Sequence, residues 1–425
     1  MIVLQIGLCS LFAFAVLSFG AVEVWSQTIL EVGAAALLVF WAFLFYRDAE
    51  AKIRWSPLNW PFLALILIGL LQFSLHGTAY AFLTRTELLR FAAYFVVFFL
   101  LAQAFCRRTE FEALAWFLIF FCFAVSLLGI VQRFTAGKEI YWMSSLNVQN
   151  DSFGPFVNRN HFAGFVELTL PAGLGLMIFR GVRRELFPLL VLLTIVPVSA
   201  LVLSGSRGGI VGFVFELGVL GLLARVRRKD EAPKIAVLGI VALAALALIG
   251  WVGADNAIQR FSAVSKVDLT FSRRASMARD TNRIFLDHPV KGIGLGALTA
   301  VYPRYETSYD GLVVEHVHND YLEGLAETGV AGGLCGLAFL WLLFRESRRS
   351  FTASQGHFSR GLHAGAIAAV AGLLLHSFMD FNLHIPSNAL LFLLQVFLAT
   401  SIPLPPRARD PQQRSARQEF SAVSG

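Results

Sequence analysis

Two histidines, an asparagine and two acidic residues stand within one stretch, His316-Val317-His318-Asn319-Asp320-Tyr321-Leu322-Glu323. A neutral imidazole can accept a proton from a hydroxyl nucleophile near neutral pH. His316 and His318 could instead share a metal ion, although no third ligand stands at a clear spacing. Asn319 or Asp320 is also a suitable N-cap, and Asp320-x-x-Glu323 resembles a capping box. The residue types alone leave base, metal ligand and helix cap open.

The position of His318 favours the base. A helix is predicted to begin at about Tyr321, so His318 lies just outside its N-terminus. The positive end of the helix dipole disfavours an imidazolium ion there. His318 is therefore a candidate proton acceptor; the alternative is that Asn319 or Asp320 only caps the helix and both histidines are solvated bystanders.

The composition predicts that this stretch lies at a membrane surface. The chain has 425 residues, of which 56% are hydrophobic and 15% charged, whereas soluble proteins carry about 25% charged residues. Apolar runs of roughly 17–25 residues recur along it, as transmembrane helices require. We predict an all-α polytopic membrane protein with twelve transmembrane helices, at 2–20, 27–46, 58–75, 88–106, 113–131, 162–179, 187–203, 209–224, 235–253, 322–344, 361–378 and 386–402.

Charge distribution orients these helices. Lys and Arg concentrate in short segments that alternate with the two long ones, 132–161 and 254–321. Because short cytoplasmic loops carry the excess of Lys and Arg, both termini are predicted in the cytoplasm and both long segments outside. Residues 1–403 are expected to form one membrane domain that includes the external loop 254–321. The polar residues 404–425 are expected to be a disordered cytoplasmic tail.

Several other external residues could bind a substrate. Arg207, in Ser204-Gly205-Ser206-Arg207-Gly208-Gly209, stands between two apolar runs, where a charge needs an anionic partner such as phosphate or a lipid headgroup. Asn160 and His161 precede a transmembrane run and could bind sugar hydroxyls or cap the helix. Residues 273–286 are predicted to form an amphipathic helix on the outer membrane surface. Its arginines could face headgroups or a pyrophosphate; they are Arg273, Arg274, Arg279 and Arg283.

These motifs, in this order, resemble the O-antigen ligase and O-antigen polymerase family of bacterial membrane glycosyltransferases. The strongest match is His318-Asn319 followed, after nine residues, by Gly329 and, after two more, by Gly332. The others are Arg274 with Asp287-His288-Pro289 and 292–296, the segment 206–209 and the segment 156–163. The resemblance covers about residues 60–400 and implies a GT-C-like fold in the bacterial inner membrane.

The resemblance also implies an activity. Such enzymes transfer a glycan from a polyprenyl-diphosphate carrier to an acceptor hydroxyl on the periplasmic side. It makes His318 the base and Arg207 and Arg274 the ligands of the donor diphosphate. Asn160, His161, Arg279, Arg283, His316, Asn319 and Glu323 are then candidate supporting or substrate-binding residues. An inverting transfer that needs no metal or other cofactor is implied, and nucleic acid is not a partner.

Two alternatives remain open. A ligase transfers the glycan to a lipid A core sugar, whereas a polymerase of O-antigen or exopolysaccharide repeat units transfers it to another glycan, with the same donor. A transporter of lipid-linked saccharides would use carboxylates within the membrane as coupling sites, and candidates are Glu167, Glu216 and Asp380. It would also need related halves, which the sequence does not show clearly.

Overall fold

The structure is a computed structural model, and it describes residues 1–136, 139–143, 152–225, 239, 264–309, 311 and 313–404, except for the side chains of 264–271. Over these residues it contains helices and no β-strands. The first group is α1 (Ile2–Leu17), η1 (Phe19–Ala21), α2 (Val24–Arg47), α3 (Asn59–Ser74), α4 (Ala81–Ala104), α5 (Arg108–Thr135), α6 (Arg159–Ile178), η2 (Arg184–Leu186), α7 (Phe187–Ser204) and α8 (Arg207–Arg225). The second is α10 (Val264–Asp287), α11 (Leu298–Val301), η3 (Tyr302–Arg304), α12 (Asp320–Ala353), α13 (His357–His376), η4 (Asn382–His384) and α14 (Pro386–Thr400).

Eleven of the twelve predicted spans overlap one described helix each. Within the described part of the chain, eight helical segments are long and apolar enough to cross a membrane, and α1, α3 and α14 are shorter apolar helices. The chain is therefore a polytopic membrane protein. The predicted ninth span, 235–253, and most of the predicted cytoplasmic tail lie outside the described residues.

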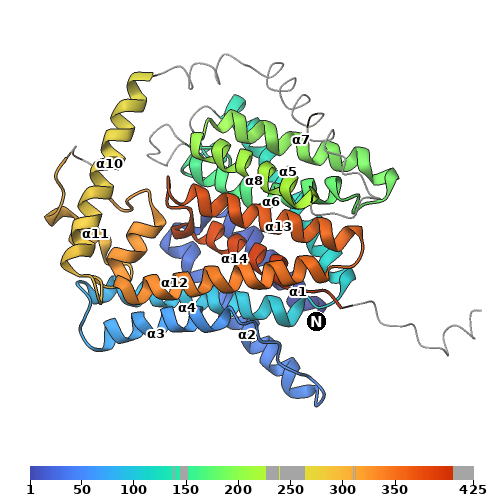
Figure 1. Cartoon of the computed structure of the whole chain (residues 1–425), viewed down its shortest axis with the longest axis horizontal. Helices are drawn as coiled ribbons and strands as arrows, with labels where there is room; N and C mark the ends of the chain where they lie inside the picture. The colour runs from blue at the N-terminus through green and yellow to red at the C-terminus, as the bar shows by residue number, and fades with distance from the viewer. Residues whose placement is uncertain are drawn as a thin grey trace, which may run out of the picture.

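The described ends of the chain lie at one end of the helix bundle, and α10 and α11 lie at the other (Figure 1). Gln5 on α1 donates a hydrogen bond to the carbonyl of Ala104, the last residue of α4, at 2.8 Å. Leu404 pairs with Arg107, one residue before α5. This arrangement places the start of α12, and with it the histidine stretch, far from the N-terminus.

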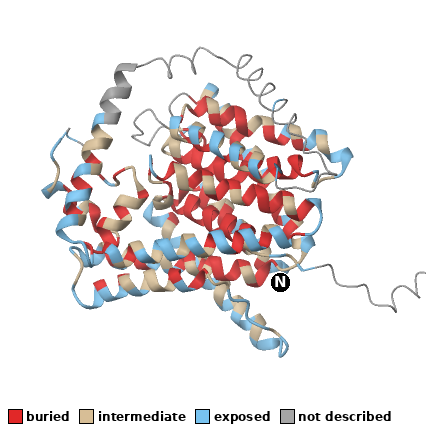
Figure 2. Ribbon diagram, viewed as in Figure 1, coloured by how far each residue is buried: buried red, intermediate tan, exposed pale blue. Residues whose placement is uncertain are grey.

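Helices α6 and α13 form the centre of the bundle, where buried residues concentrate (Figure 2). Residues 161–178 of α6 are all buried. Glycines let the two backbones approach closely: a Cβ on Gly175 would lie 2.2 Å from the Gly361 carbonyl oxygen, and one on Gly365 would lie 2.3 Å from that of Pro171. The close packing holds the start of α6 beside the end of α13, and this junction carries the candidate site.

The helix predicted at 273–286 exists as the second half of α10, but its apolar face is covered by protein. Met277 and Ile284 are buried in a small core with Leu298, Tyr302 and Val317. Spacing within the sequence predicts an apolar face but not what covers it. Here the residues that follow α10 fold back and cover that face. This small core holds the segment that precedes α12.

Candidate active site

Asp380 is the centre of the candidate site. It lies between α13 and η4 with its side chain 1% exposed. One carboxylate oxygen, Oδ1, lies 3.0 Å from His318 Nδ1 and also accepts the Phe381 amide at 2.9 Å. The other oxygen, Oδ2, accepts a hydrogen bond from Asn160 Nδ2 at 2.5 Å and lies 3.7 Å from Arg274 Nη2. Three segments far apart in the sequence therefore meet at one carboxylate.

Asp380 is ionised in this environment. Burial by itself raises the pKa of a carboxyl group, but the hydrogen bond and charge of His318, with His161 and Arg274, hold the pKa of Asp380 well below its usual range. An ionised Asp380 can accept a hydrogen bond from His318 Nδ1. In that tautomer Nε2 carries the free lone pair, which is the orientation that a general base requires.

The backbone around His318 is unusual. Its φ angle is +53°, in the left-handed region that few residues other than glycine adopt. The next residue, Asn319, caps α12 by accepting the amides of Tyr321 and Leu322 at 3.1 and 3.0 Å. This turn leaves the His318 side chain 24% exposed at the start of α12, so a ligand can approach it.

The ring of Phe381 contacts the rings of three histidines. Its ring centroid lies 4.8 Å from that of His161, 4.7 Å from His316 and 5.0 Å from His318. His161 is only 6% exposed, so it forms a wall of the site and does not reach a substrate. Asn160, which precedes it, is part of the site through Asp380.

The structure separates the predicted arginines. Arg274 reaches the site, where Nη1 donates to the Met379 carbonyl at 2.7 Å. Arg207 is exposed at the start of α8, whose first turn packs on α13: a Cβ on Gly208 would lie 2.5 Å from His376 Nε2. Arg279 and Arg283 are exposed, and Arg279 bonds to Ser276 Oγ on its own helix at 3.0 Å. Among the described residues, neither of these two contacts the Asp380 cluster.

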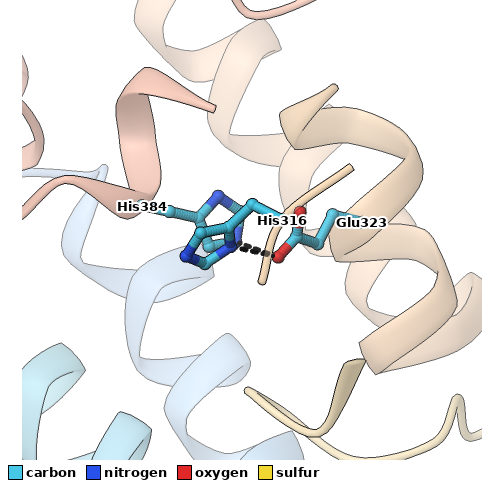
Figure 3. Close-up of side chains that lie close together, drawn as sticks. All are labelled: His316, Glu323 and His384. Carbon is cyan, nitrogen blue, oxygen red and sulfur yellow. Dashed lines mark hydrogen bonds and ion pairs between the residues drawn. The ribbon is translucent and has the colours of Figure 1, made fainter. Parts of the chain in front are cut away.

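A second cluster lies beside the first and involves His316, Glu323 and His384 (Figure 3). Glu323 Oε1 lies 2.6 Å from His316 Nδ1 and 3.4 Å from His384 Nε2. Glu323 Oε2 accepts the Val317 amide at 3.0 Å. The capping box expected from Asp320-x-x-Glu323 is therefore absent from this described segment. Asn319 is the N-cap. The Glu323 carboxylate instead contacts the segment before α12, where it binds the His316 side chain and the Val317 backbone amide.

Asp320 also points away from the helix end. Its Oδ1 lies 2.6 Å from His384 Nδ1, and its Oδ2 accepts the Leu383 amide at 3.2 Å. Burial disfavours the imidazolium form of His384, but Glu323 and Asp320 favour it more strongly and raise the pKa of His384 to about 10. His384 and Asp380 were the important residues that sequence reasoning did not place in the site. No local spacing connects either to the histidine stretch.

The carboxylates within the membrane are deeply buried in the helix bundle. Glu167 Oε2 lies 2.6 Å from His376 Nδ1, and both side chains are almost fully buried. Glu216 is buried with no hydrogen-bond partner for either oxygen among the described residues. A Cβ on Gly212 would lie 1.8 Å from Glu167 Oε1, and one on Gly372 would lie 2.3 Å from Glu216 Oε1. The glycines thus make room for two large acidic side chains between α6, α8 and α13.

An apolar groove of about 580 Å³ runs from the second cluster along α12, between α3, α4 and α14. Its walls include Phe62, Phe91, Leu337 and Phe392. Its charged lining consists of Glu87, Asp320, Glu327 and His384, and it contains no arginine or lysine. The mostly apolar walls suit a lipid chain.

A search of curated proteins finds no match to the chain. A family model described as O-antigen ligase matches residues 189–337. The matched region includes Arg207, Arg274, His318 and Glu323, whereas Asp380 and His384 follow it. The match supports the resemblance found in the motifs: residues 189–337 are similar to the O-antigen ligase family.

Proposed function

We propose that this protein is an inverting glycosyltransferase that moves a glycan from a polyprenyl-diphosphate carrier to an acceptor hydroxyl on the periplasmic side of the bacterial inner membrane. The observation that carries the proposal is the His318–Asp380 pair, 3.0 Å apart, with Arg274 on the same carboxylate. It combines a general base and a cation that can bind phosphate at one end of a membrane bundle. Residues 1–403 form the membrane domain, and both termini are cytoplasmic.

The proposed reaction is a direct displacement. The acceptor hydroxyl gives its proton to His318 Nε2 as its oxygen attacks the anomeric carbon of the donor sugar. The bond from that carbon to the diphosphate oxygen breaks, and the electron pair leaves with the polyprenyl diphosphate. Attack opposite the leaving group inverts the anomeric centre. Arg274 and Arg207 bind the diphosphate and stabilise the charge that it gains, so the step requires no metal ion.

The two substrates are proposed to approach from different sides. The cationic residues Arg274 and Arg207 lie on α10 and α8, and this side suits the diphosphate. The apolar groove lies on the other side, against α3, α4 and α14, and its lining offers no arginine or lysine to a diphosphate. Carboxylates accept hydrogen bonds from sugar hydroxyls. We therefore place the lipid chain of a lipid-anchored acceptor in the groove, as a ligase requires.

The groove can be tested by filling it. A Cβ on Gly336, which lines the groove on α12, meets no atom within 4 Å. Gly336→Trp is therefore expected to fold normally but to reduce transfer to the lipid acceptor about tenfold, roughly 1.4 kcal/mol. The matched control is Gly218→Trp on α8, where a Cβ also meets no atom within 4 Å. Equal activity of the two variants in purified form would remove the groove from the proposal.

Arg274 is tested by donor kinetics. Hydrogen bonds to charged groups contribute about 1.5–3 kcal/mol each, so Arg274→Ala is expected to lower kcat/KM for the lipid-linked donor by roughly 10- to 100-fold. Arg274→Lys keeps the charge but loses the forked geometry and should recover only part of the activity. Arg304→Ala, at an exposed loop arginine, is the control. An unchanged kcat/KM for Arg274→Ala would assign diphosphate binding to other residues.

The activity itself is tested with purified protein, a polyprenyl-diphosphate-linked glycan and candidate acceptors. Formation of a new glycosidic bond without added nucleotide or metal is the expected result, and no transfer to any acceptor would reject the proposal. Glycan analysis of a deletion strain separates the two classes of acceptor. Long carrier-linked chains accumulate if the protein is a ligase, whereas single repeat units accumulate if it is a polymerase.

A further inference from the structure

The second cluster has a geometry that the proposed glycan transfer does not use. His316 comes from the segment before α12, Glu323 from the first turn of α12 and His384 from η4. One atom from each of these side chains, namely a ring nitrogen of each histidine and a carboxylate oxygen of the glutamate, lies within 4.8 Å of the other two (Figure 3). Two imidazoles and one carboxylate thus converge from three separate elements.

We propose that His316, Glu323 and His384 bind a zinc ion. Two histidines and a glutamate are a known set of three protein ligands for zinc. Ligand atoms about 2 Å from a tetrahedral zinc ion lie roughly 3–3.5 Å from each other. The Glu323 Oε1 atom lies 2.6 Å from His316 Nδ1 and 3.4 Å from His384 Nε2. Opening the first separation by roughly 0.4 Å or more would bring both into that range, and the two ring nitrogens lie within 4.8 Å of each other.

The groups around the three ligands support this proposal. His384 Nδ1 lies 2.6 Å from Asp320 Oδ1. The carboxylate can accept a hydrogen bond from this nitrogen and so orient the ring with Nε2 toward Glu323. A carboxylate that orients a histidine through its other nitrogen is typical of zinc sites. The second oxygen of Glu323 is held by the Val317 amide at 3.0 Å, which fixes the carboxylate. The His316 and His384 side chains are 27% and 19% exposed, so an ion can enter.

The sequence offered only His316 and His318 as a metal-binding pair. The fold gives these histidines different partners, since His316 lies beside Glu323 and His318 beside Asp380. Zinc at the second cluster would join the segment before α12 to α12 and to η4. Because His318 follows in the same segment, the ion would position the base without contacting the diphosphate. The transfer chemistry proposed above would remain free of metal.

The test measures zinc in the full-length protein in detergent, purified without metal-affinity resin. After incubation with zinc sulfate and gel filtration, the protein is expected to retain about one zinc ion per chain. Zinc should also raise its melting temperature, because an ion that binds only the folded state stabilises it. Magnesium should not, since this cation prefers oxygen ligands. Retention of no zinc by the wild-type protein, or equal stabilisation by magnesium, would overturn the proposal.

Variants then assign the ligands. His316→Ala, Glu323→Gln and His384→Gln are each expected to lose the retained zinc and the zinc-dependent rise in melting temperature. His76→Ala, at an exposed histidine outside the cluster, should keep both. Cobalt(II) gives a second readout, because a site with low coordination number produces visible absorption that Glu323→Gln should abolish. Zinc retention by all three ligand variants would place the ion elsewhere on the chain.

These measurements do not depend on glycan transfer. His318→Gly should retain zinc even though it removes the proposed base. Loss of zinc binding and failure of the proposed function are therefore separate outcomes, each with its own assay.

Discussion

His318→Gly is expected to abolish glycan transfer while leaving the protein folded. The φ angle of His318 is +53°, and glycine adopts this conformation with no steric cost, which offsets part of the loss of the contact with Asp380, so the variant should still fold. It removes the only proposed group that accepts the proton of the acceptor hydroxyl. A general base contributes roughly 10²- to 10⁴-fold to a rate, which corresponds to about 3–5 kcal/mol of activation free energy.

The measurement is kcat with a lipid-linked donor at saturating acceptor, together with the melting temperature of each variant. His318→Gln keeps a side chain that can hydrogen-bond but has no basic nitrogen, so it should be as inactive as His318→Gly. His76→Ala, at an exposed histidine, should retain full activity. Added imidazole is expected to restore part of the activity of His318→Gly. Transfer by either His318 variant at the wild-type rate would show that another group accepts the proton.

The membrane helices could be predicted from the sequence because their signal is local. An apolar run of the length needed to cross a bilayer has few other uses, and its backbone hydrogen bonds are satisfied within the helix itself. For example, α5 at Arg108–Thr135 contains the predicted span 113–131. The ends are less well predicted, because a helix such as α12 continues beyond the apolar run to Ala353. Polar residues are tolerated where a helix leaves the membrane.

The candidate site was only partly predictable, because a local motif names one partner of each contact. His318 and Arg274 were found from their motifs. Asp380, which contacts both, lies 62 positions after His318 and 106 positions after Arg274 in the sequence. Asp380 was noted only as a carboxylate near a membrane span. Its contacts with the site form only in the folded protein, where the packing of α6 against α13 also brings Asn160 to the same carboxylate.

Helix periodicity explains why the arginines of α10 do not all reach Asp380. Arg279 follows Arg274 by five positions, so the two side chains leave the helix in different directions, since an α-helix has 3.6 residues per turn. Ile284 and Asp280 of α10 are buried, whereas Arg279 and Arg283 are exposed. The fold of the whole loop decides which face of α10 lies toward the site. The spacing of the arginines does not contain that information.

Asp380→Asn is expected to lower kcat by roughly 10²- to 10⁴-fold, although the residue acts through His318 and does not touch the substrate. At present Asp380 Oδ1 lies 3.0 Å from His318 Nδ1 and accepts the Phe381 amide, while Oδ2 accepts Asn160 and faces Arg274. An asparagine must place its NH₂ group toward one of these two sets of donors. If it faces His318, it stabilises the tautomer with the proton on Nε2, and that nitrogen can no longer act as a base.

The pH profile distinguishes this positioning role from loss of stability. The pKa of Asp380 is held well below its usual range. A depressed pKa favours the folded state at pH values above the unfolded pKa, and this stabilisation is lost only as the pH falls toward the folded value. Asp380 therefore keeps its charge through the neutral range, so the wild-type rate should not fall there through protonation of this carboxylate. Asp380→Asn removes the charge at every pH, so it should change the rate profile as well as reduce kcat.

The control is Asp280→Asn on α10. The Asp280 carboxylate is equally buried and accepts a hydrogen bond from Thr307 Oγ1 at 2.9 Å. It should lower the melting temperature without moving the pH profile, because Asp280 contacts no residue of the proposed base pair. If Asp380→Asn lowers only the melting temperature and leaves kcat and the pH profile unchanged at a temperature where it is folded, Asp380 is structural. His318 would then accept the proton without its help, and the buried carboxylate would serve only to join α6, α10 and α13.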